Sequence, residues 1–132
     1  MRVPPDPSLT IRRMVKAHPP RLPYTEIKEE ILGSAYDLSL VFVGAQRSRS
    51  LNHRFRKKNA PANVLAFPLS PKSGEIVICL EKARRDAPDF AMSYRTFVGY
   101  LFIHGILHLK GFRHGRTMDR EEKLLLKQFS LV

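Results

Sequence analysis

Three of the five histidines fall within eleven residues and have the spacing of a metal site. His104 and His108 are four residues apart, so on a helix both imidazoles project from one face. Gly111 can end that helix and turn the chain back, which would bring His114 to a third corner. Three neutral imidazoles leave a fourth tetrahedral position for water, the pattern of a catalytic rather than a structural zinc ion. We therefore predict one Zn²⁺ bound by these three histidines, although histidines that merely pack or hydrogen-bond are the alternative.

The spacing HxxxHxxGxxH also occurs in metzincin proteases, where a glutamate after the first histidine is the general base. Gly105 stands at that position here, so a peptidase of this kind would lack its base. A metallopeptidase is therefore the less favoured alternative. His18 precedes two prolines and His53 lies in a basic stretch, and we expect both to be ordinary surface residues.

The charge balance points to a phosphate-bearing partner. The 132 residues include 23 Lys and Arg against 12 Asp and Glu, a net charge of +11. A small domain this basic typically meets nucleic acid or another anionic surface. We therefore expect nucleic acid as the partner. A membrane is not expected, because no apolar run reaches the roughly 18 residues of a span and no basic amphipathic helix with bulky anchors is evident. The single cysteine, Cys79, and an N-terminus without a secretory signal favour the cytoplasm.

The histidines need a rigid helix and a sheet to position them. Residues 93–109 read as a long apolar helix, capped by Ser93 and ended by Gly111. Alternation of apolar residues predicts a strand at 38–43, and a short strand is expected at 64–67. Residues 76–79, with Cys79 in the core, read as a strand buried on both faces.

The remaining elements complete an α+β pattern. Thr25 is expected to cap a helix that ends at Gly33, and residues 46–59 begin as a basic helix. Residues 117–131 read as an amphipathic helix capped by Thr117. Its core-facing residues are expected to be Leu124, Leu125 and Phe129. Residues 1–23 hold six of the ten prolines and could include a short helix or a strand after Ser8. The length fits one domain over residues 1–132, an α+β fold with a small mixed sheet packed with helices.

Four blocks in order resemble one family. HGILHLKGFRH, residues 104–114, resembles the HGxLHLxGxDH signature of the YbeY endoribonucleases, the ribosomal RNA maturation factors. LNHRFRKKNAPANVLAFPLS resembles the family's LNxxYRxKDxPTNVLSFP segment, SGEIVICLEKA its GDIVIS strand and MDREEKLLL its closing helix. The resemblance covers about residues 36–130.

The resemblance implies a cytoplasmic α+β protein with one zinc ion on His104, His108 and His114. It implies a single-strand-specific endoribonuclease that acts in 16S rRNA 3′-end maturation and ribosome quality control. Its implied partners are RNA rather than DNA, namely the rRNA precursor and the small ribosomal subunit. The family's arginine in the YR segment, needed for activity, maps to Arg56. A non-catalytic, zinc-containing ribosome- or RNA-binding factor is the main alternative.

The basic residues near these motifs are candidates for binding the RNA backbone. We expect that role for Arg54, Arg56, Lys57, Lys58, Arg84 and Arg85. Phe55 and Phe112 could stack on bases, but we expect both to be buried.

The chain departs from the family pattern beside the third histidine. Arg113 stands where the family has Asp, and an arginine cannot accept the hydrogen bond through which a carboxylate could orient a ligand histidine. Asn59, Ala62 and Ala66 replace the family's Asp, Thr and Ser.

Overall fold

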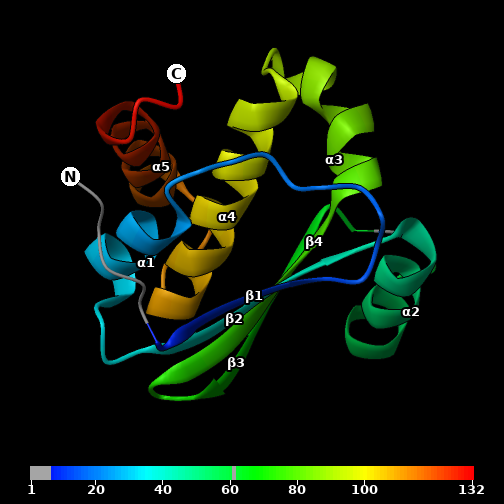
Figure 1. The fold of residues 1–132 in the computed structure, drawn as a ribbon, viewed down its shortest axis with the longest axis horizontal. Helices are drawn as coiled ribbons and strands as arrows, with labels where there is room; N and C mark the ends of the chain where they lie inside the picture. The colour runs from blue at the N-terminus through cyan, green and yellow to red at the C-terminus, as the bar shows by residue number, and fades with distance from the viewer. Residues whose placement is uncertain (1–6, 61) are drawn as a thin grey trace.

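The computed structural model describes residues 7–60 and 62–132, which form one four-stranded sheet with helices on both faces (Figure 1). The helices α1, α4 and α5 cover one face, and α2 lies against the other. Within the described part of the chain, no helix combines the length and apolar character needed to cross a membrane. The helices are α1 (Tyr24–Leu32), α2 (Ala45–Arg56), α3 (Leu80–Asp86), the 3₁₀ turn η1 (Ala87–Phe90), α4 (Tyr94–Lys110) and α5 (Arg116–Gln128).

The sheet has the order β1-β2-β4-β3 and is mixed. β1 (Leu9–Arg13) and β2 (Asp37–Val43) pair in parallel, as do β2 and β4 (Ser73–Cys79). β3 (Val64–Ser70) pairs antiparallel with β4 and forms the edge next to α4. This arrangement confirms the predicted α+β fold with a small mixed sheet.

The two central strands are buried on both faces, and each face has its own cluster of apolar side chains. Phe42 and Ile78 point into the main core with α1, α4 and α5, whereas Val41 and Val77 point into a smaller cluster under α2. Alternate side chains of a strand point to opposite faces, which produces this division. Cys79 belongs to the smaller cluster and is a core residue, as predicted, and burial raises the pKa of its thiol.

α4 crosses the main face of the sheet and carries two of the histidines. Ser93 caps it as predicted, because its hydroxyl oxygen accepts a hydrogen bond from the Thr96 N–H at 3.1 Å. Gly111 ends the helix in the left-handed region, at φ 109°. The N–H of Phe112 then donates to the Leu107 carbonyl at 2.9 Å, which turns the chain back toward the sheet.

Several local predictions are wrong. Thr25 and Thr117 are not caps, because α1 and α5 begin earlier and have Pro23 and Gly115 at their N-cap positions. Leu124 does not face the core: it is 55% exposed, since the buried side of α5 runs through Met118 and neighbours at helical spacing. Leu125 is buried and Phe129 packs partly against the core, as predicted.

Other differences concern the extent of the elements. The N-terminal segment forms the strand β1, not the short helix that was the other possibility. α3 and η1 were not predicted, because the buried strand β4 runs into α3 without a glycine or proline between them. The strands β3 and β4 form a hairpin and extend further toward the turn between them than their apolar residues indicate.

Candidate metal centre

The three histidines meet at one point between α4 and the start of α5. His104 and His108 come from α4, and His114 lies in the loop that follows Gly111. Their rings form a close triangle, with centroid separations of 4.6 Å, 4.5 Å and 5.2 Å. One nitrogen from each ring lies within 4.8 Å of the others. The first two rings are partly buried and His114 is exposed, so the cluster opens to solvent on one side.

Hydrogen bonds at Nδ1 orient the two helical imidazoles. The Nδ1–H of His104 donates to Glu122 Oε2 at 2.5 Å, and the Nδ1–H of His108 donates to the Phe112 carbonyl at 3.1 Å. Because a carbonyl can only accept, the His108 proton is on Nδ1. The Nε2 atoms of the two rings then face each other, 3.2 Å apart. Burial, followed by the nearby His104 ring, lowers the pKa of His108, which favours the neutral ring that a metal requires.

Glu122 is a site residue that the motif analysis missed. It comes from α5, is only 4% exposed, and bonds to the ring of His104. The available signal was its place on the buried side of an amphipathic helix, four residues after Met118 and three before Leu125. A carboxylate at such a position needs a partner, since an unpaired buried charge is costly.

Replacing Glu122 with glutamine is expected to weaken zinc binding by roughly tenfold. Outer carboxylates that orient a ligand histidine typically change metal affinity by about 10–100-fold, and the amide keeps an acceptor but loses the charge. Competition with a chromophoric chelator measures the zinc Kd. Glu121→Gln is the matched control, because Glu121 is the neighbouring carboxylate and lines a different pocket. Equal zinc affinity in Glu122→Gln and wild type would remove Glu122 from the site.

The histidines line one wall of a groove of about 640 Å³. Strand β3 supplies the facing wall, through residues 64–67, and the end of α2 supplies Phe55 and Arg56. Asn63 also lines the groove and was not singled out from the sequence. Arg56, which the family resemblance assigns to activity, thus lies in the same groove as the three histidines although it is 48 positions before the first of them.

Two buried polar residues of α2 hold the loop that leads to the groove. The Ser48 hydroxyl donates to the Ala62 carbonyl at 2.6 Å and accepts from the Ala62 N–H at 2.8 Å. The Asn52 side-chain amide donates to the Ala60 carbonyl at 2.8 Å. These bonds tie the loop back onto α2, so the end of that helix and the start of β3 approach the histidines together.

Of the six predicted RNA-binding residues, Arg56 is the one that lines this groove. Arg84 lies on α3 with its guanidinium carbon 4.1 Å from the centre of the Tyr94 ring, beside a different pocket. The other predicted residues are exposed: Arg54, Lys57, Lys58 and Arg85. His18 and His53 are exposed, as expected for surface residues.

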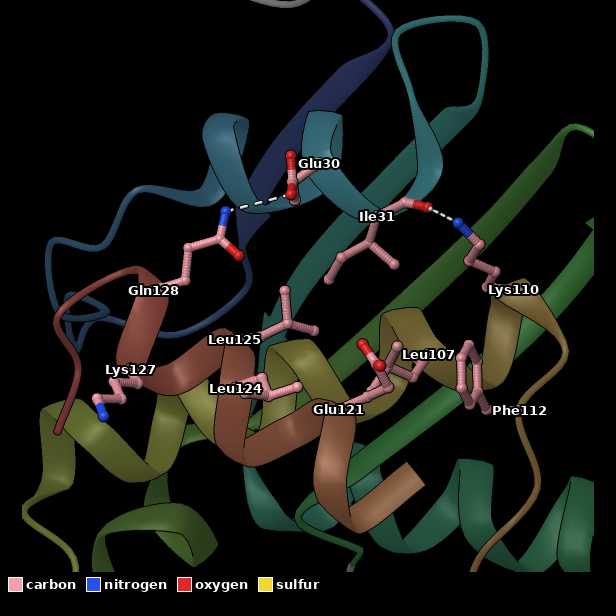
Figure 2. A pocket seen from close by; sticks show the side chains of 10 residues that line it. All are labelled: Glu30, Ile31, Leu107, Lys110, Phe112, Glu121, Leu124, Leu125, Lys127 and Gln128. Carbon is pink, nitrogen blue, oxygen red and sulfur yellow. Dashed lines mark hydrogen bonds between the residues drawn. The ribbon is translucent and has the colours of Figure 1, made fainter. Parts of the chain in front are cut away.

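The structure separates the two phenylalanines that were considered together. Phe112 is partly buried against the core and lies with Leu107 in a second pocket, of about 520 Å³, between α1 and α5 (Figure 2). Phe55 is 55% exposed and lines the groove that contains the three histidines, called the metal groove below. The expectation that Phe55 is buried is therefore wrong. The buried side of α2 is formed by Ser48 and Asn52, and Phe55 lies on the side of the helix that faces solvent.

Gly105 and Arg113 acquire a structural explanation. A Cβ on Gly105 would lie 3.1 Å from the Ile76 side chain of β4, so any larger residue there, including the glutamate of a metzincin, would require that side chain to shift. Arg113 is exposed, although it directly precedes His114, and its side chain is not among those that line the groove. The carboxylate that orients His104 comes from Glu122, not from the position before His114.

The comparison with known proteins agrees with this geometry. A family model described as Endoribonuclease YbeY matches residues 12–131. The chain belongs to the Endoribonuclease YbeY family. Relatives named Endoribonuclease YbeY include one from Geobacillus kaustophilus, 35% identical over 111 residues that cover 73% of this chain and 70% of the relative. Another, from Carboxydothermus hydrogenoformans, is 38% identical over 104 residues, 70% of this chain and 73% of the relative.

A solved structure shares the fold. The solution structure of TM1509 from Thermotoga maritima matches with a TM-score of 0.64 and 25% identity, over 92% of this chain and 88% of that one. Membership of the YbeY family confirms the resemblance seen in the histidine motif and its three companion blocks.

Proposed function

We propose that this chain is a zinc-dependent endoribonuclease that cleaves single-stranded RNA at the 3′ end of the 16S rRNA precursor. The observation that carries the proposal is the pair of inward-facing imidazole nitrogens, 3.2 Å apart, in the groove that also holds Arg56. The names of the relatives supply the reaction class, RNA cleavage. The family resemblance supports three further parts of the proposal: the small ribosomal subunit as the partner, ribosome quality control as a second role, and the cytoplasm as the location. We further propose that residues 1–132 work as one YbeY-like domain.

The donor set fits zinc. Tetrahedral Zn²⁺ with Zn–N distances near 2.0–2.1 Å holds two ligand nitrogens about 3.3 Å apart. The Nε2 atoms of His104 and His108 already lie at 3.2 Å, close to this separation. Three imidazoles without a thiolate leave one position open, and the only cysteine is buried in the cluster under α2.

Each protein group has a role in the proposed reaction. Bound zinc supplies a Lewis acid that activates water and polarises a phosphoryl oxygen. Glu122 holds His104 in the tautomer that presents Nε2 to the groove. Arg56 binds the non-bridging oxygens of the scissile phosphate, because its planar fork matches two of them and stabilises the charge that develops in the transition state. Arg54, Lys57 and Lys58, which are exposed at or just after the end of α2, bind neighbouring phosphates.

The test is cleavage of a 16S 3′-end transcript by purified protein, before and after chelation and after metal add-back. We expect chelation to abolish cleavage and Zn²⁺ to restore it better than Mg²⁺, since imidazole ligands suit zinc and oxygen ligands suit magnesium. The same transcript annealed to a complementary strand should resist cleavage. Cleavage that survives chelation would contradict the zinc assignment.

The test also separates the alternatives. A zinc-loaded protein that binds the transcript but does not cut it would support a non-catalytic RNA-binding factor. Turnover of a peptide without turnover of RNA would support a metallopeptidase, which the contact between Gly105 and Ile76 disfavours.

A further inference from the structure

Phe55 is a large aromatic side chain left exposed beside the metal groove. It is 55% exposed, although two neighbours contact it: the Phe67 ring, with centroids 5.0 Å apart, and the Arg54 guanidinium carbon, 5.4 Å from its centre. Phe67 is partly buried on β3 and supports the exposed ring from the sheet. An apolar ring held in this way offers a fixed face to solvent without the loss of conformational entropy that a mobile side chain would incur.

The ring pair is also the boundary between two hollows. Phe55 and Phe67 line the metal groove together with Arg56 and the histidines. The same two rings line a second groove, of about 430 Å³, on the outer face of the sheet beneath α2. The charged residues that line the second groove are two arginines, Arg12 and Arg47, and one carboxylate, Glu75. A nucleic-acid strand that runs from the metal groove to the second groove must therefore pass over the Phe55 ring.

The charges around the ring favour nucleic acid as the occupant. Residues 45–60 contain six Lys or Arg and no Asp or Glu. Phe55 lies directly between Arg54 and Arg56 in sequence, with two lysines after them. Aromatic rings set among cations are the common device for holding single strands, because bases stack on the rings while the cations bind phosphates. A hydrophobic protein segment could use the exposed ring, but it would have no use for so many uncompensated cations.

We infer that Phe55, supported by Phe67, is a stacking site for one nucleobase of the single strand, adjacent to the nucleotide held at the metal centre. The Arg54 guanidinium lies close enough to add a cation–π contribution to the stack. The site is tolerant of sequence, because every base has a π face, and it favours purines, which have the larger one. It also selects single strands, since a paired base cannot leave its own stack without cost. This inference rests on the proposed function, because it requires RNA in the metal groove.

The test measures binding rather than cleavage, so that it does not depend on the metal. Wild type and variants are treated with chelator and titrated with fluorescent single-stranded oligo(A) or oligo(U) of about ten nucleotides, within the usual site size. Phe55→Leu keeps the apolar volume but removes the aromatic face. Phe55→Tyr keeps the face. Phe90→Leu is the matched control, because Phe90 is another exposed aromatic residue, at 49%, and lines neither groove.

We expect Phe55→Leu to weaken oligo(A) binding by roughly tenfold and oligo(U) binding by less, since loss of one stack typically costs a fold-change of this order. Phe55→Tyr and Phe90→Leu should bind as wild type does. Single abasic substitutions along the oligo(A) strand should identify one position whose loss weakens wild type but not Phe55→Leu. That coupling between a base and the ring is the signature of stacking.

Two results would overturn the inference, and they differ in what they say about the proposed function. If wild type cleaves and binds RNA but Phe55→Leu binds oligo(A) equally well, the stacking site is wrong and the endoribonuclease stands. If wild type neither cleaves the transcript nor binds either oligonucleotide, the proposed function and the stacking site are both wrong.

Discussion

Replacing His108 with alanine is expected to remove stoichiometric zinc and to reduce RNA cleavage by more than about 10³-fold. Deleting a single hydrogen-bond donor to the transition state typically lowers the rate by about 10²–10³-fold. Loss of a metal ligand should cost more, because it removes the metal itself. His108 is the middle ligand of the cluster: its ring lies 4.6 Å from His104 and 4.5 Å from His114. Two remaining imidazoles cannot complete a three-nitrogen site, so the metal would have no fixed position.

The measurements are zinc content by elemental analysis after dialysis and the single-turnover rate on the 16S 3′-end transcript. The control is His18→Ala, because His18 is an exposed histidine far from the motif in sequence. Purifying this variant in parallel shows whether a contaminating ribonuclease accounts for the cleavage. Wild-type zinc content in His108→Ala would show that the metal binds elsewhere. Equal cleavage rates for His108→Ala and wild type would show that the groove is not the site of the reaction.

Replacing Arg56 with alanine is expected to lower the cleavage rate at saturating RNA by about 10²–10³-fold. The residue is exposed at the end of α2, so its truncation should not affect folding. Lysine at this position should recover only a small part of the rate, because an ammonium lacks the planar fork that binds two phosphoryl oxygens at once. The zinc content of both variants should equal that of wild type.

A split between rate and affinity tests this role. If Arg56 acts on the transition state, the rate at saturation falls while the RNA Kd changes little. If Arg56 only binds the backbone, the Kd rises and the saturated rate is retained, and the catalytic assignment is then wrong. Arg49→Ala is the matched control, since Arg49 is an exposed arginine of the same helix that does not line the metal groove.

Arg113 is the position where this chain departs most from its family's motif. The structure leaves its side chain exposed and supplies the carboxylate to His104 from α5. The orientation of the first ligand therefore does not depend on the residue before His114. This gives a physical reason to expect zinc binding despite the substitution.

What could be predicted from the sequence is what local geometry determines. His104 and His108 share a helix face because of their spacing alone, and Gly111 ends the helix because a left-handed residue there is easiest for glycine. Ser93 caps α4 through a hydrogen bond that spans three residues. The buried strand β4 follows from an uninterrupted apolar run. In each case the interacting groups are within a few residues of one another.

What the tertiary structure alone decided depends on contacts between distant segments. Glu122 reaches His104 only because α5 packs on α4, and Arg56 meets the histidines only because α2 and β3 approach α4 across the edge of the sheet. The exposure of Phe55 depends on which side of α2 faces the sheet, and the polar Ser48 and Asn52 decide that by bonding a loop. Apolar character does not say which aromatic residue the packing will leave uncovered. The candidate metal ligands could therefore be predicted from spacing, whereas the residue that orients His104 and the groove that surrounds the histidines required the fold.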